Sequence, residues 1–215
     1  MLHKIVLLKE ENSIKRQYRF GDVVNHRGYY WEESTHFILN QNHLKGTILR
    51  DYIERCPDNN KTINPEKISL LYTIIQEKNK ILPTDDELVI HLRTGDVIHY
   101  DWFLKKDYEK IIHDYIDKYQ IKKVTFCTAF HYGNNVTQKI FLYTDEKHEQ
   151  NKVKINELFE KLISHFKDIQ FDVKSSTNID EDFMYMCMAR HFVKDEGGFS
   201  DLIKLINKYD KDSIL

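Results

Sequence analysis

The residues best suited to chemistry lie at the end of a short apolar run, Leu88–Leu92, near the middle of the chain. His91 and Arg93 are followed by Gly95 and Asp96. The Arg93 guanidinium is a planar fork of donors that suits phosphate oxygens. Gly95 lets the backbone approach a ligand closely, because it has no side chain. This pattern favours an anion or sugar-phosphate site over the ordinary polar end of a buried strand.

A second group of polar residues surrounds a glycine turn near the C-terminus. Gly197, Gly198 and Phe199 lead to Ser200, which we expect to be the N-cap of a helix over residues 201–209. Unpaired N–H groups and the helix dipole at such an end can hold a phosphate. Taken alone, this short motif favours an ordinary capped helix.

The segments around both groups alternate between strand and helix patterns. Strands are predicted at residues 4–8, 88–92, 123–127, 169–173 and 191–193, with a further apolar run at 139–143. Helices are predicted at residues 47–56, 65–80, 106–119, 154–166 and 201–209, and a short one from Asp180 or Asp182. Because strand, helix and strand follow one another, we predict an α/β fold with a doubly wound parallel sheet. Ligands of such sheets bind outside the carboxyl ends of the strands.

Pro83 and the polar residues after it separate an N-terminal part, residues 1–84, from a C-terminal domain, residues 85–215. The N-terminal part contains an aromatic segment with His26, Arg27 and Trp31. These residue types suit an acceptor carbohydrate, since aromatic faces pack on sugar rings and polar groups bond to hydroxyls. A small aromatic core with satisfied polar groups is an equal alternative.

Composition excludes several classes of protein. A net charge of -2 over 215 residues gives no general reason to expect nucleic acid or an anionic membrane as partner. Three widely spaced cysteines without CxxC spacing indicate neither a disulfide framework nor a zinc site. No apolar run has the length of a signal peptide or a membrane span. We therefore expect a soluble, cytoplasmic protein.

Together and in this order, the two motifs resemble those of the fucosyltransferase superfamily, which includes α-1,2-, α-1,6- and protein O-fucosyltransferases. The segment His91-Leu92-Arg93-Thr94-Gly95-Asp96 is similar to the HxRRxD motif of these enzymes, especially its HxRRGD form. Thr94 stands where the family has a second arginine. The later family pattern falls on Asp182-Phe183, Met186, Ala189-Arg190-His191, Val193 and Gly197-Gly198-Phe199-Ser200. Gly197 and Gly198 replace a pair of hydroxyl residues.

The resemblance implies a Rossmann-like, nucleotide-sugar-binding lobe of a GT-B glycosyltransferase. Arg93 is implied to bind the β-phosphate of a GDP-sugar, and Ser200 with the N–H groups of residues 197–199 the same diphosphate. His91 and Asp182 are implied to lie near the guanine and ribose. The implied reaction is inverting transfer of fucose, or a related sugar, to a glycan hydroxyl, with no metal and no cofactor besides the donor.

An inverting displacement needs a group that accepts the proton of the acceptor hydroxyl. Asp101 is the first candidate, because the α-1,6 enzymes carry their acid/base glutamate at the corresponding place. Asp96 and His99 are the alternatives. Two other functions remain open: a non-catalytic nucleotide- or glycan-binding module, and a metal site formed by His91, His99 and His131, whose spacing matches no recognised motif.

Overall fold

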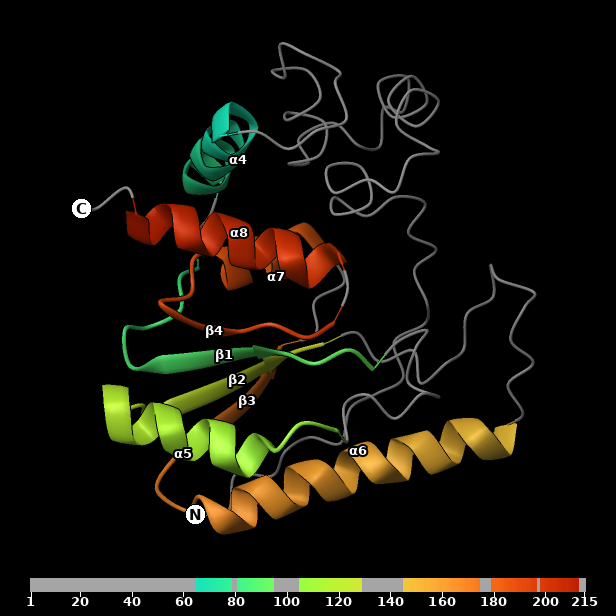
Figure 1. The fold of residues 1–215 in the computed structure, drawn as a ribbon. Coiled ribbons are helices and arrows are strands. Elements are labelled where there is room, and N and C mark those ends of the chain that lie inside the picture. The colour runs from blue at the N-terminus through green and yellow to red at the C-terminus, as the bar shows by residue number, and fades with distance from the viewer. Residues whose placement is uncertain are drawn as a thin grey trace. The chain divides into compact units, whose positions relative to one another are not determined.

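The computed structural model describes residues 65–78, 81–94, 105–128, 145–174, 179–196 and 198–212 (Figure 1). These residues divide into two compact units. The first unit contains the described residues between Thr84 and Thr177, and the second contains those up to Pro83 together with those from Asn178 onward. The predicted division into residues 1–84 and 85–215 remains a prediction.

Three parallel strands form the sheet of the first unit, in the order β3-β2-β1. They are β1 (Glu87–His91), β2 (Lys123–Cys127) and β3 (Gln170–Lys174). The helices α5 (Tyr108–Tyr119) and α6 (Asp145–His165) connect them in the chain. An α/β fold with parallel strands is thereby confirmed, while the doubly wound and GT-B arrangements remain predictions.

One face of this sheet is covered by both helices, which lie on the same side of the strands in Figure 1. The Phe126 ring of β2 meets Tyr108 of α5 edge-on, with ring centroids 6.0 Å apart. The same ring lies 5.1 Å from that of Phe159 of α6. All three side chains are buried. Because side chains alternate across a strand, Phe126 and its neighbours form the apolar core on the helix side of the sheet.

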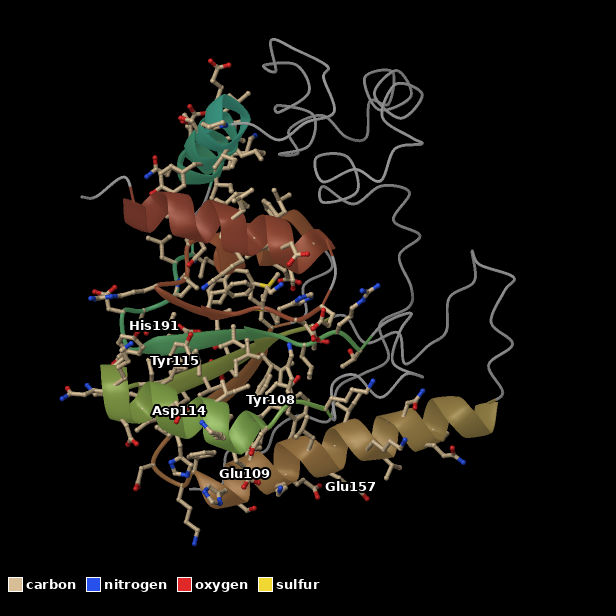
Figure 2. The ribbon with its side chains drawn as sticks, in the orientation of Figure 1. Tyr108, Glu109, Asp114, Tyr115, Glu157 and His191 are labelled. Atoms are coloured by element: carbon tan, nitrogen blue, oxygen red, sulfur yellow. The ribbon has the colours of Figure 1, made fainter. Side chains whose placement is uncertain are left out.

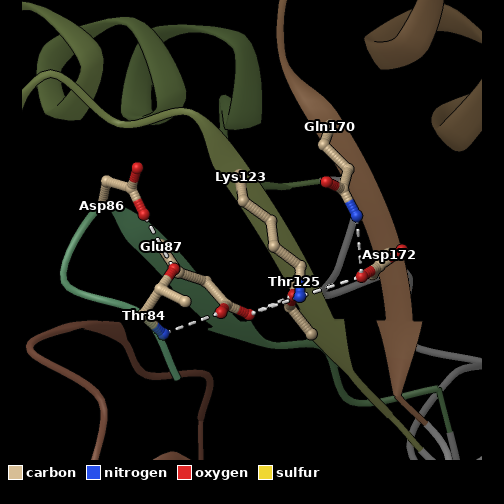
Figure 3. A network of polar contacts seen from close by, with 7 residues as sticks. All are labelled: Thr84, Asp86, Glu87, Lys123, Thr125, Gln170 and Asp172. Atoms are coloured by element: carbon tan, nitrogen blue, oxygen red, sulfur yellow. Dashed lines mark hydrogen bonds and ion pairs between the residues drawn. The ribbon is translucent and has the colours of Figure 1, made fainter. Parts of the chain in front are cut away.

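The opposite face carries a polar network at the amino ends of the strands (Figure 3). Buried Glu87 of β1 accepts hydrogen bonds from the Thr125 hydroxyl and, at 3.1 Å, from the Thr84 N–H. Lys123 forms ion pairs with Glu87 at 3.4 Å and with Asp172 of β3 at 2.9 Å. Burial lowers the pKa of Lys123, but its bonds to Asp172 and Glu87 outweigh this, so the pKa is raised. The network therefore joins all three strands through satisfied charges.

Helix boundaries in the first unit follow local chemistry. Asp107 caps α5 by accepting a hydrogen bond from the Lys110 N–H at 3.0 Å, so the helix begins two residues later than predicted. Its end is fixed by Gln120, whose φ of 55° is left-handed and whose N–H bonds to the Ile116 carbonyl. The helix α6 begins at Asp145, well before the predicted residue 154. Its first turns lack the apolar repeat on which that prediction depended.

The second unit consists of α4 (Pro65–Lys78), α7 (Ile179–Cys187), β4 (His191–Val193) and α8 (Gly198–Asp212). The helix α8 packs against both α4 and α7. Its buried apolar residues are Leu202, Ile203 and Ile206, and those of the partner helices include Leu71, Ile74, Ile75, Phe183 and Met186. Phe183 and Met186 thus belong to the apolar core of this unit.

Buried Asn207 of α8 caps the C-terminal end of α7 with hydrogen bonds. Its Nδ2 donates to the Cys187 carbonyl at 3.1 Å and also to the Ala189 carbonyl. These two carbonyls lie at and just beyond the end of α7, where helical partners are missing.

Across the residues described, none of the helices has both the length and the apolar character needed to cross a bilayer.

Candidate functional site

The predicted anion site begins where β1 ends. His91 is the last residue of this strand, is half-buried and lies in register with Cys127 of β2. The next residue, Leu92, continues the pairing, because its N–H donates to the Cys127 carbonyl at 2.9 Å. Arg93 follows and is half-buried. The structure thus places Arg93 at the carboxyl edge of the parallel sheet, where ligands of such folds bind.

Thr94 has a structural role at this edge. Its side chain is fully buried, and its hydroxyl lies 2.6 Å from that of Thr128, the buried residue that follows β2. The Thr94 side chain therefore points into the protein and does not extend toward solvent. Instead, the hydroxyl pair ties the loop after β1 to the loop after β2.

The residues directly before and after Arg93 are both anchored to the end of β2. The backbone of Leu92 is bonded to Cys127, and the side chain of Thr94 is bonded to Thr128. Both anchors lie on the same neighbouring strand end, so the backbone of Arg93 has little freedom to move away from the sheet. A side chain on an anchored backbone loses less entropy when it binds a phosphate or carboxylate than one on a free loop does.

The second predicted group lies in the second unit, where α7 and α8 come together. Asp182 belongs to α7 and is buried, and its neighbour Phe183 packs on Phe199 with ring centroids 5.7 Å apart. Gly198, Phe199 and Ser200 are the first three residues of α8. The structure therefore brings Asp182 and the start of α8 to neighbouring parts of one helix pair.

Ser200 is not the N-cap that the sequence predicts, because α8 begins two residues earlier. Its fully buried hydroxyl accepts a hydrogen bond from the Asp195 N–H at 3.1 Å. The Asp195 carboxylate in turn accepts from the Glu196 N–H at 2.9 Å. The serine side chain thus folds the turn before α8 back on the helix. The positive end of the α8 dipole at this turn favours an anion.

Lys194 adds positive charge next to this turn. Its ammonium bonds to Asp201 in the first turn of α8. This hydrogen bond raises the pKa of Lys194 because it favours the charged ammonium. Because both groups are exposed, the pair contributes little stability. It does keep a cation beside the residues that follow β4.

Several predicted site residues lie outside the described residues. They are His26, Arg27, Trp31, Asp96, His99, Asp101, His131 and Gly197. The three candidates for the catalytic base and the acceptor-side group are therefore still predictions. In the described ranges, no group of three or more His, Cys, Asp or Glu side chains gathers in a way that could hold a metal ion.

Sequence reasoning missed Thr128 and Asp195. Thr128 could have been found, because it directly follows the strand next to β1 and the carboxyl ends of parallel strands meet at one edge. Asp195 gives no comparable signal, since its backbone bond to Ser200 depends on the shape of the turn.

Comparison of the chain with protein-family models, curated proteins and solved structures gives no match.

Proposed function

We propose that the protein is an inverting, metal-independent glycosyltransferase that transfers fucose or a related sugar from a GDP-sugar to a glycan hydroxyl. The proposal joins the motif resemblance to the observed parallel α/β fold. The single observation that carries it is the anchored position of Arg93 directly after β1. A half-buried arginine fixed at the carboxyl edge of a parallel sheet is well suited to bind a nucleotide diphosphate.

The second unit, taken by itself, also has groups that suit a nucleotide. The start of α8 is the positive end of a helix dipole, and Asp182 on the adjoining α7 offers a carboxylate. A carboxylate can accept from the guanine N1–H and the exocyclic amine together, whereas adenine offers no such pair. In the first unit the proposal assigns the diphosphate to Arg93, and in the second unit it assigns the guanine base to Asp182.

In the proposed reaction, the acceptor hydroxyl attacks the anomeric carbon while the bond from that carbon to the diphosphate breaks. The leaving diphosphate gains negative charge, which Arg93 neutralises. The hydroxyl proton passes to a base, for which Asp101 remains the first candidate and Asp96 and His99 the alternatives. No metal ion is required in this scheme, because fixed donors take its place.

A non-catalytic nucleotide- or glycan-binding module is the second candidate, and Thr94 favours it. Its hydroxyl is occupied by Thr128 inside the protein, so the motif presents one cation where the related enzymes present two. A single cation suffices to bind a diphosphate but stabilises the charge of a departing one less. The two candidates differ in turnover and agree in GDP binding.

Isothermal titration with GDP, ADP and UDP tests the shared part of both candidates. We expect GDP to bind most tightly, and Arg93→Ala to weaken GDP binding about tenfold or more, since a charge-assisted contact contributes about 1.5–3 kcal/mol. Arg93→Lys should recover only part of the affinity, because an ammonium lacks the planar fork. Lys110→Ala is the control, since this exposed cation on α5 pairs with Asp114.

Release of GDP from GDP-fucose and related GDP-sugars, measured with and without glycan acceptors, then separates the candidates. Turnover supports the transferase, and tight GDP binding with no release from any donor supports the binding module. Unchanged GDP affinity in a folded Arg93→Ala protein, or a preference for ADP or UDP in the unaltered protein, would contradict both.

A further inference from the structure

A pair of histidines links α5 and α6 on the surface of the first unit. His113 lies within α5, and His165 is the last residue of α6. Their Nε2 atoms are 3.0 Å apart, and the two rings are nearly perpendicular, with an interplanar angle of 87°. Both side chains are exposed. Two imidazoles that face each other through the same nitrogen present two metal-ligating atoms at one point of the surface.

The surroundings hold the two rings in place. The Phe166 ring lies 4.7 Å from the His113 ring and 4.7 Å from the His165 ring, measured between centroids. Phe166 is buried, so it forms a fixed apolar base under the pair. An ion pair between Glu109 of α5 and Lys161 of α6, at 2.6 Å, joins the same two helices, and Figure 2 shows Glu109 on α5. The ligating atoms are therefore brought together by the fold before any ion binds.

We propose that His113 and His165 form a bidentate surface site for a divalent transition-metal ion that prefers imidazole ligands, with water completing the coordination. Metal–nitrogen bonds of about 2.0–2.1 Å and a nitrogen separation of 3.0 Å give an angle of about 95° at the metal. Cis positions of square-planar or octahedral ions have angles near 90°, whereas a tetrahedral ion needs about 109°. The angle is compatible with cis positions of Cu²⁺ and Ni²⁺, which is why Ni²⁺ is chosen as the probe.

Binding replaces the hydrogen bond between the rings by two metal bonds. One Nε2 of the pair carries the proton of this bond, and because both rings are exposed, exchange with water can move that proton to Nδ1 of the same ring. Both Nε2 lone pairs are then available, and a small rotation of the rings turns them toward a common ion. The site lies away from Arg93. The end of α6 precedes the start of β3, so His165 lies toward the amino edge of the sheet, while Arg93 follows the carboxyl end of β1. The inference is therefore independent of the proposed transferase.

Titration of the full chain with NiCl₂, followed by calorimetry, tests the site by counting bound ions. Other histidines contribute their own weak sites, so the decisive quantity is the difference between variants. We expect His113→Gln and His165→Gln each to lose the same single equivalent of Ni²⁺, since one imidazole alone holds the ion weakly. The control is His148→Gln, which changes a histidine seventeen residues before His165 on α6 and about 25 Å away along the helix axis. This variant should still bind the equivalent of Ni²⁺ that the other two lose.

Two further measurements accompany the titration: one shows that the variants are folded, and the other detects Ni²⁺ binding in the unaltered protein. Circular dichroism establishes that each variant is folded, and glutamine is chosen because it favours helix. In the unaltered protein, Ni²⁺ at a hundred times its dissociation constant should raise the melting temperature by about 5–10 °C, because it binds only the folded helix pair. Retention of the equivalent in either folded variant, or loss of it in His148→Gln, overturns the proposal. So does the absence of any Ni²⁺-dependent rise in the unaltered protein.

Discussion

Replacing Thr94 by valine removes one of the two hydroxyls that hold the ends of β1 and β2 together. The Thr128 hydroxyl then loses this partner in a site from which water is excluded, since both residues are buried. A buried polar group deprived of its hydrogen bond costs about 1–3 kcal/mol. In a chain of this length, that cost corresponds to a melting temperature lower by about 3–10 °C.

A double-mutant cycle isolates the hydroxyl pair from other effects of the substitution. The free energies of unfolding of Thr94→Val, Thr128→Val and the double variant are measured by urea denaturation and compared with the unaltered protein. Because the double variant leaves neither hydroxyl of the pair behind, it should be less destabilised than the sum of the single variants, with a coupling of about 1–2 kcal/mol. Thr94→Ser keeps the hydroxyl and should lose little.

The same variants connect stability with the proposed site. Thr94→Val removes one of the two anchors of Arg93, so GDP affinity should fall several-fold, although Thr94 itself is buried away from solvent. The matched control is Thr73→Val on α4, an exposed threonine whose hydroxyl bonds to the Ser69 carbonyl. It should change stability by less than about 0.5 kcal/mol. Zero coupling between Thr94 and Thr128 would refute the reasoning.

Two further predictions concern buried groups of the second unit. Asn207→Leu should lower the free energy of unfolding by about 2–3 kcal/mol, because the Cys187 and Ala189 carbonyls both lose their donor; urea denaturation measures this, and a loss below 1 kcal/mol would argue against the cap. Burial raises the pKa of the Cys187 thiol well above its usual value, so iodoacetamide at pH 8 should modify Cys187 only after denaturation, as peptide mass spectrometry would reveal. Since the unfolded thiol ionises above about pH 8.5 while the folded one keeps its proton, stability should fall as pH rises past that point, by up to about 1.4 kcal/mol per pH unit, and Cys187→Ala should remove this part of the slope. Alkylation of the native protein, or an unchanged slope in the variant, would count against a sealed thiol.

Local sequence patterns determined the elements of the two units. The apolar residues of β1 and β2 form short continuous runs bounded by polar residues, and their bounds were predicted to within one residue. The helix α4 was predicted from its apolar repeat and from Pro65, which opens it. These signals act over a few residues, because backbone geometry and burial of one face decide them. Where the repeat was absent, as at Asp145, the prediction failed.

Only the tertiary structure decided what the polar side chains do. Thr94, predicted as a departure within a ligand motif, is a buried contact to a residue 34 positions later in the chain. Ser200, predicted as a helix cap, bonds to Asp195 inside a turn. His113 and His165 lie 52 positions apart and meet because two crossover helices cover one face of the sheet. A hydrogen bond depends on distances of a few tenths of an ångström between atoms of separate segments, and residue types alone do not specify those distances.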